Sequence, residues 1–262
     1  MAMIAGTGSQ VSTGSMTDHP AAASPRRLAR IAGGLYLLNI VAGMFAIGVV
    51  PALLFVEGDA AATLHNIQAH ALLYRLSLAA HLLPIMCNVP LVVILYDLFK
   101  VVNRRLALLM VFYSVVGTAV ESANLLQQFT PLVLLDGARA APALTADQLQ
   151  ALAYAPLRLQ TFGYDIQQVI YAGYLLAAGY LVFRSTFFPR VIGVLLAIGA
   201  VSYLTYSFAS FLAPAFAARL VPYIQLPSLV GEGSLCLVLL AIGVNVQRWR
   251  GQASAAGRAA PW

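Results

Sequence analysis

The stretch LALLMVFYSVVGTAVESANLLQQFTPLVLL, residues 106–135, decides the fold. It contains one acidic or basic side chain, Glu121, near its middle. A helix of about thirty residues, rising about 1.5 Å per residue, is long enough to cross a hydrocarbon core of about 30 Å. A charge at that depth costs about 2.5–3.5 kcal/mol on insertion scales, so an acid kept inside a span is a candidate functional residue. The stretch therefore predicts a transmembrane helix that carries a buried carboxylic acid.

The composition of the whole chain is that of a membrane protein. Hydrophobic residues make up 61% of the 262 residues and charged residues 9%, whereas soluble domains have about 45–50% and about 25%. The net charge of +6 comes from short basic clusters beside apolar segments, a pattern that sets membrane topology. Cys87 and Cys236 each lie inside an apolar segment, which argues against a disulfide framework. We therefore expect the lipid bilayer, and not nucleic acid, as the partner.

Further apolar segments predict an all-α integral membrane bundle of six transmembrane helices. The expected spans are residues 31–55, 76–99, 106–135, 162–183, 191–212 and 223–246. Asp59 opens an amphipathic stretch that runs to Arg75 and predicts a short interfacial helix continuous with the second span. Thr145 predicts the N-cap of another short helix, over residues 144–154, ahead of the fourth span.

The basic residues predict the orientation of the bundle. Eleven Lys and Arg residues fall on the side of the N-terminus and four on the opposite side. By the positive-inside rule both termini are cytoplasmic and the region near Asp147 is external, as in a multi-pass protein of the bacterial cytoplasmic (inner) membrane. Residues 1–24 and 251–262 are predicted to be disordered cytoplasmic tails around a six-span membrane domain, residues 25–250.

Polar side chains recur at three- and four-residue spacing within several spans, so each set shares one helix face. Span two contributes His81, Pro84 and Asn88, span three contributes Ser114, Gly117, Thr118, Glu121 and Gln128, and span six contributes Gln225, Ser228, Glu232 and Cys236. With the predicted orientation these groups fall in the outer half of the membrane. The candidate intramembrane polar site consists of Glu121, Glu232, His81, Arg75, Asn88 and Asn124.

We expect Glu121 and Glu232 to line one cavity, with at least one of them protonated near neutral pH. Burial disfavours a charged carboxylate, and a second acid nearby disfavours a second charge. Arg75 is expected to turn inward and pair with an acid. Hydrogen bonds between helices, worth about 0.6–2 kcal/mol each, are a sufficient explanation for Asn88 and Asn124 without any ligand.

Three classes of function remain open. The first is a small transporter or sensor module that binds a proton, a cation or a small solute through Glu121 and Glu232. The second is a structural or partner-binding membrane protein without ligand chemistry, and the third is a membrane-embedded enzyme that acts on lipid or quinone. No HExxH, GxSxG, P-loop, paired CxxC or Gly-xxx-Gly motif occurs. Catalytic residues, a metal site and a cofactor are therefore not predicted, and a protein partner is not identified.

Several strings resemble a known family. They are NIQAHALLYRLSLAA, LYDLFKVVNRRLALL, GYLVFRSTFFPRVIGVLLAIG, SYLTYSFASFLAP and LPSLVGEGSLCLVLLAIGVN, which lie between residues 30 and 246. They are similar to the bacterial membrane family known as domain of unknown function 4386. The resemblance implies an integral membrane domain of six or seven helices without an assigned activity. The positions that match the family's motifs are Arg75, Asn103, Arg104, Pro189, Arg190 and Glu232. Relatives often carry Arg where this chain has Tyr113.

Overall fold

The computed structural model describes residues 24–137, 145–221 and 223–259, and within these ranges the chain forms helices and turns without a strand. In chain order the helices are α1 (Pro25–Gly43), the π-helical η1 (Met44–Val49), α2 (Val50–Leu54), α3 (Ala60–Ala69), α4 (Ala71–Phe99), α5 (Arg104–Gly137), α6 (Ala146–Arg184), α7 (Arg190–Leu212), α8 (Pro214–Leu220), the 3₁₀-helical η2 (Tyr223–Gln225), α9 (Leu226–Leu237), the π-helical η3 (Val238–Ile242) and α10 (Val246–Ala259).

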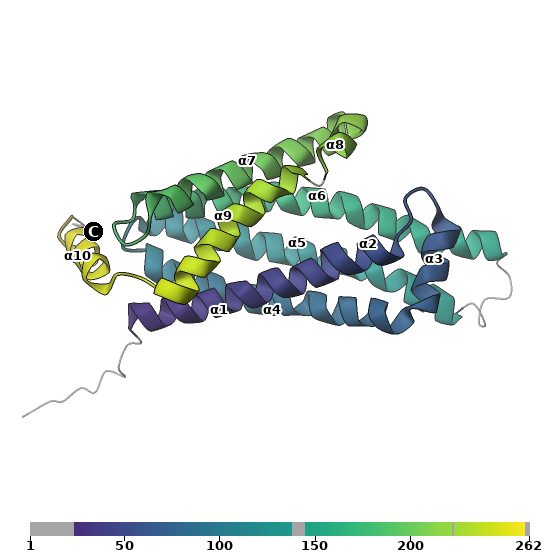
Figure 1. Cartoon of the computed structure of the whole chain (residues 1–262), viewed down its shortest axis with the longest axis horizontal. Coiled ribbons are helices and arrows are strands. Elements are labelled where there is room, and N and C mark those ends of the chain that lie inside the picture. Colours follow the sequence, from purple (N-terminus) through teal and green to yellow (C-terminus); the bar gives the residue numbers. More distant parts are fainter. Residues whose placement is uncertain (1–23, 138–144, 222, 260–262) are drawn as a thin grey trace, which may run out of the picture.

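Six helical segments of the described chain are long and apolar enough to cross a membrane, as predicted. They are Pro25–Leu54, Ala71–Phe99, Arg104–Leu134, Gln150–Arg184, Arg190–Leu212 and Tyr223–Ile242. They run roughly along one axis, with α7 and α9 tilted against the others (Figure 1). The chain is therefore a multi-pass helical membrane protein.

The first span begins at a cap and changes its geometry near a proline. The Ser24 side chain accepts a hydrogen bond from the Arg27 amide, and Pro25 occupies the first turn, where its missing N–H is not needed. Farther along, Pro51 has no N–H to donate to the carbonyl of Ile47, four residues earlier. The turns Met44–Val49 are π-helical, and such a widened stretch is a known way to accommodate a local break in the helical ladder.

The predicted helix before span two is present as α3, but it is not continuous with α4. Asp59 caps it by accepting from the amide of Ala62. His70 leaves helical geometry, with φ −118° and ψ 38°, and separates the two helices. The break lets α3 bury Leu64 and Ile67 in a cluster with residues of α6, so burial of this apolar face explains why one straight helix does not form.

The short helix predicted over residues 144–154 is instead the first part of α6. Thr145 is its N-cap as predicted, and Gln148 completes a reciprocal capping box. The helix continues through Pro156 into the fourth span without a break. An interior proline costs about 3 kcal/mol or more. Ala153 and Leu157, on either side of it, are both buried against α3, and this packing offsets that cost.

Glycines bring the spans into backbone contact at several crossings. A Cβ on Gly193 would lie 2.5 Å from the carbonyl oxygen of Gly179, where α6 and α7 cross. A Cβ on Gly199 would lie 2.7 Å from Cα of Ser228 in α9, and one on Gly33 would lie 2.5 Å from the amide nitrogen of Leu240 in η3. Small residues at such crossings let backbones pack closely, which is how helices associate in lipid.

Residues 251–259, part of the segment predicted as a disordered tail, are helical and belong to α10; residues 260–262 and the tail 1–23 lie outside the described residues. Asn245 accepts from the amide of Arg248 at the start of α10. The indole N–H of Trp249 donates to the carbonyl of Leu98 at 3.0 Å, and Gln252 accepts from Thr186 in the turn between α6 and α7. These contacts order a segment whose small and polar residues alone favour disorder.

The basic residues gather at one end of the bundle, which we call the basic end. The described Lys and Arg residues there are Arg26, Arg27, Arg30, Lys100, Arg104, Arg105, Arg184, Arg190, Arg248, Arg250 and Arg258. The opposite end, near α3 and α8, holds Arg75, Arg158 and Arg219 among the described residues (Figure 1). The side of the membrane on which each end lies stays a prediction.

Candidate functional site

A cavity of about 570 Å³ lies inside the bundle and is lined by residues of every span. Its lining includes Tyr36 of α1 and Glu232 of α9 and extends to η1, α2 and the start of α9. In the same region α9 crosses α1 near the basic end and then diverges from η1 and α2 (Figure 1). The cavity lining includes three residues of the predicted site that carry ionisable side chains, namely His81 of α4, Glu121 of α5 and Glu232 of α9. The predicted convergence of the two acids on one cavity is thus seen in the structure.

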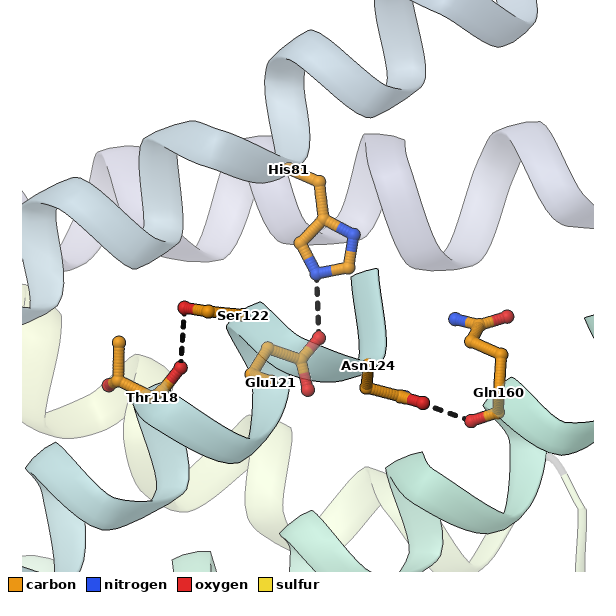
Figure 2. Close-up of polar contacts among 6 residues, drawn as sticks. All are labelled: His81, Thr118, Glu121, Ser122, Asn124 and Gln160. Carbon is orange, nitrogen blue, oxygen red and sulfur yellow. Dashed lines mark hydrogen bonds and ion pairs between the residues drawn. The ribbon is translucent and has the colours of Figure 1, made fainter. Parts of the chain in front are cut away.

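His81 and Glu121 form a direct contact within this cavity. Nε2 of His81 lies 2.6 Å from Oε1 of Glu121, and the two side chains face each other between α4 and α5 (Figure 2). The other polar atom of each side chain, Nδ1 of His81 and Oε2 of Glu121, is buried and makes no hydrogen bond to the described residues. The pair therefore keeps one donor or acceptor on each residue for a further partner.

Glu232 has a different environment, made of tyrosine hydroxyls. The hydroxyls of Tyr36 and Tyr171 donate to its Oε2 at 2.8 and 2.6 Å, and Tyr203 donates to Oε1 at 3.4 Å. The ring of Tyr171 stacks on Tyr174 with centroids 5.0 Å apart and meets Tyr203 edge-on. Glu232 as a whole residue is 8% exposed. Glu121 and Glu232 thus share a cavity but not a hydrogen bond, because each is bound by its own partners.

The polar face of span three extends from Glu121 toward the basic end. Nδ2 of Asn88 donates to the hydroxyls of Ser114 and Thr118 at 2.8 and 2.5 Å. All three residues line the cavity, and their bonds join α4 to α5. The predicted shared faces of His81 with Asn88 and of Ser114, Thr118 and Glu121 are therefore correct.

Asn124 joins two helices and does not belong to the described cavity lining. Its Nδ2 donates to the carbonyl oxygen of Gln160 at 2.9 Å, from α5 to α6 (Figure 2). Its side chain lies against Gly163, where a Cβ would overlap the amide oxygen. Asn124 therefore forms a hydrogen bond between helices, which is a sufficient explanation for it without any ligand.

Gln168 is a lining residue that sequence reasoning did not single out as a site residue. It is 1% exposed, and neither its amide nitrogen nor its amide oxygen has a hydrogen-bond partner among the described residues. Asp165, one turn earlier in α6, accepts from Ser210 through Oδ2 at 2.5 Å. Gln168 is thus a fully buried amide beside the cavity with both of its polar atoms unsatisfied.

Comparison with known proteins gives a family. The chain matches the family described as domain of unknown function (DUF4386) over residues 31–243. It belongs to the DUF4386 family. Neither the comparison with curated proteins nor the comparison with solved structures finds a match.

The residues at positions that match DUF4386 motifs lie in different parts of the structure. Glu232 lines the cavity, whereas the side chain of Asn103 caps α5 by accepting from the amide of Leu106 at 3.0 Å. Pro189 precedes the first turn of α7. Arg75 is exposed and is not among the described residues that line the cavity. The structure therefore does not bring Arg75 into the candidate site of this DUF4386 protein.

The described residues contain no group of three or more His, Cys, Asp or Glu side chains that could hold a metal ion. The residues that line the site supply carboxyl, imidazole, amide and phenol groups. Such groups bind protons, ammonium groups and hydrogen-bonding solutes. The tyrosines around Glu232 were missed from the sequence, although their position in the middle of spans, away from the membrane interface where tyrosine is usual, was a signal.

Proposed function

We propose that this protein is a small transporter or sensor module whose cavity binds a proton or a small cationic solute. Glu121 with His81 forms one binding element of this site, and Glu232 with its tyrosines forms the other. The proposal includes a location in the bacterial cytoplasmic membrane with both termini in the cytoplasm. The distribution of basic residues between the two ends of the bundle supports that orientation.

One observation carries the proposal: buried polar atoms on residues that line the cavity lack partners among the described residues. They are Nδ1 of His81, Oε2 of Glu121 and both amide atoms of Gln168. Each unsatisfied buried group costs about 1–3 kcal/mol. A core that served only to hold helices together would gain stability by satisfying these atoms, as Asn88 and Asn124 are satisfied. A ligand that supplies the missing hydrogen bonds explains why they are left open.

The site has the chemistry for a proton or a cation. Nε2 of His81 and Oε1 of Glu121 lie 2.6 Å apart, a separation at which an imidazole and a carboxyl group can share one proton. A cation that enters the cavity would meet Oε2 of Glu121 and the amide oxygen of Gln168. A bound proton or cation changes the net charge inside the membrane span, and this changes how the helices around the cavity pack. Such a change in helix packing is the step that either a transporter or a sensor requires.

Thermal unfolding of the purified protein tests the proposal. Inorganic cations, ammonium and short alkylamines are each added over a concentration series, and the melting temperature is recorded. A ligand at a hundred times its Kd stabilises the folded state by about 2.7 kcal/mol. We expect at least one of these probes to raise the melting temperature of the wild type. The rise should be lost in Glu121→Gln and Gln168→Ala.

Asp97→Asn provides the matched control, because Asp97 is a partly exposed acid of α4 that pairs with Lys100 and does not belong to the described cavity lining. This variant should keep the full response to the probe. If no probe stabilises the wild type and Glu121→Gln only lowers the melting temperature, the polar interior is a structural core and the proposal is wrong.

A further inference from the structure

The rim of the cavity is apolar and faces the surroundings of the bundle. Met44 of η1 and Leu226 and Leu229 of α9 all line the cavity, yet they are 53%, 50% and 43% exposed. All three lie inside membrane-spanning segments, so the medium around them is lipid. The cavity thus adjoins the lipid phase between η1 and the start of α9.

We propose that the cavity takes up a single-chain amphiphile with an amine head group, which enters from the lipid phase between η1 and α9. This inference rests on the proposed function and names the class of ligand. The amine head lies against Glu121, Gln168 and Glu232, and the alkyl chain lies along the apolar residues of the rim.

The walls of the cavity differ in polarity in the way such a ligand requires. The wall formed by η1, α2 and the start of α9 is mostly apolar and carries Met44, Ile47, Pro51, Leu226 and Leu229 together with the polar Ser228. The wall formed by α4, α5 and α6 is mostly polar; it includes His81, Asn88, Thr118, Glu121, Gln167 and Gln168 together with the apolar Pro84 and Ile85. A wholly polar solute would make no apolar contacts with the wall of η1, α2 and α9. A wholly apolar solute would leave the polar groups of α4, α5 and α6 without hydrogen-bond partners.

Charge selects the head group. The described lining residues include two carboxylic acids, one histidine and four tyrosines, and none of them is Lys or Arg. An anionic head would therefore meet acids without a compensating cation. An ammonium group has three donors and no acceptor, which matches the unpartnered oxygens of Glu121 and Gln168. The tyrosine rings around Glu232 add favourable contacts for a cation.

Size and energetics agree with one alkyl chain. The volume of about 570 Å³ lies within the range of about 300–1,000 Å³ for small-molecule sites. Because lipid tails are as apolar as the rim, moving an alkyl chain from the bilayer into the cavity gains little. The head group, and not the length of the chain, should therefore decide which amphiphile is bound.

Photo-crosslinking of the full chain in phosphatidylcholine nanodiscs tests this inference. The probe is a dodecylamine analogue with a diazirine in its chain, and labelled peptides are mapped by mass spectrometry. We expect saturable labelling of η1 and the start of α9, displaced by dodecylamine but not by dodecanol or dodecanoic acid. Gln168→Ala should weaken binding about tenfold, the effect of losing one hydrogen bond to a charged group.

Variants at two glycines test the route of entry. Gly48 lines the cavity in η1, and Gly34 lies on the same span outside the cavity; a Cβ at either position meets no atom within 4 Å. Gly48→Leu should abolish saturable labelling, and Gly34→Leu should not.

Equal displacement of the probe by dodecanol would show that the amine head group is not what the cavity recognises. If Gly48→Leu leaves saturable labelling unchanged, entry from lipid between η1 and α9 is wrong while the proposed function stands. Without saturable labelling the amphiphile is wrong, and the thermal series with small cations decides the proposed function separately.

Discussion

The substitution Gly193→Ala tests the close crossing of α6 and α7. A Cβ at this position would lie 2.5 Å from the carbonyl oxygen of Gly179 and 2.7 Å from the amide nitrogen of Phe183. Ordinary contact begins at 3.4 Å, so the helices must separate by about 0.9 Å. Both close atoms belong to the backbone of α6, and a change of side-chain rotamer cannot relieve the overlap.

The expected loss of stability follows from two opposed effects. Overpacking costs about 1–3 kcal/mol, and a clash between two backbones belongs at the upper end of that range. Alanine recovers about 1 kcal/mol through its higher helix propensity. The net loss is about 2 kcal/mol, which corresponds to a melting temperature lower by about 4–8 °C in a protein of this size.

The native cysteines supply the assay. Cys87 and Cys236 are both buried, so a thiol-reactive fluorophore reports their exposure as the detergent-solubilised protein unfolds. Gly34→Ala is the control, because a Cβ there meets no atom within 4 Å, and its melting temperature should stay the same or rise. If Gly193→Ala is as stable as the wild type, α6 and α7 do not pack as closely as described and the reasoning is refuted.

Two further predictions concern topology and the Asn88 bonds. A membrane-impermeant maleimide should label Gln148→Cys in intact cells and Ser254→Cys only after lysis, since basic residues gather near α10; the reverse pattern would invert the orientation. Asn88→Ala should lower the melting temperature, because it removes two bonds between helices worth about 0.6–2 kcal/mol each. An unchanged melting temperature would show that the hydroxyls of Ser114 and Thr118 bond elsewhere.

The polar faces could be predicted because they depend on periodicity within one helix. Ser114, Thr118 and Glu121 recur at intervals of three and four residues, so they must share a face whatever the neighbouring helices do. A polar face in a span turns away from lipid, and two such faces in one small bundle tend to meet. The position of Glu121 and Glu232 on one cavity follows from this argument.

The partners across helices could not be predicted in the same way. That Tyr36, Tyr171 and Tyr203 all donate to Glu232 depends on how four helices are rotated against one another, which no interval within a helix specifies. The crossings at Gly193 and Gly199 carry no Gly-xxx-Gly spacing, because each of these glycines packs singly against a partner backbone. The joining of the predicted helix over residues 144–154 to the fourth span could not be predicted, because the cost of Pro156 inside a helix is local and the packing that offsets it is not.

The crossing at Gly33 has a mechanical consequence. Besides the contact of Gly33 with Leu240, Arg26 and Arg30 donate to the carbonyls of Ile242 and Ala241, so α1 is fastened to η3 near the basic end. From this fixed point to Leu226 the helix is about 21 Å long at about 1.5 Å per residue. A rotation of about 10° about the crossing would therefore displace Leu226 by about 4 Å and leave the basic end nearly still. Because Gly199 of α7 contacts Ser228 at the start of α9, α7 would move with α9 in such a rotation, and the position of the two helices would set the width of the cavity mouth.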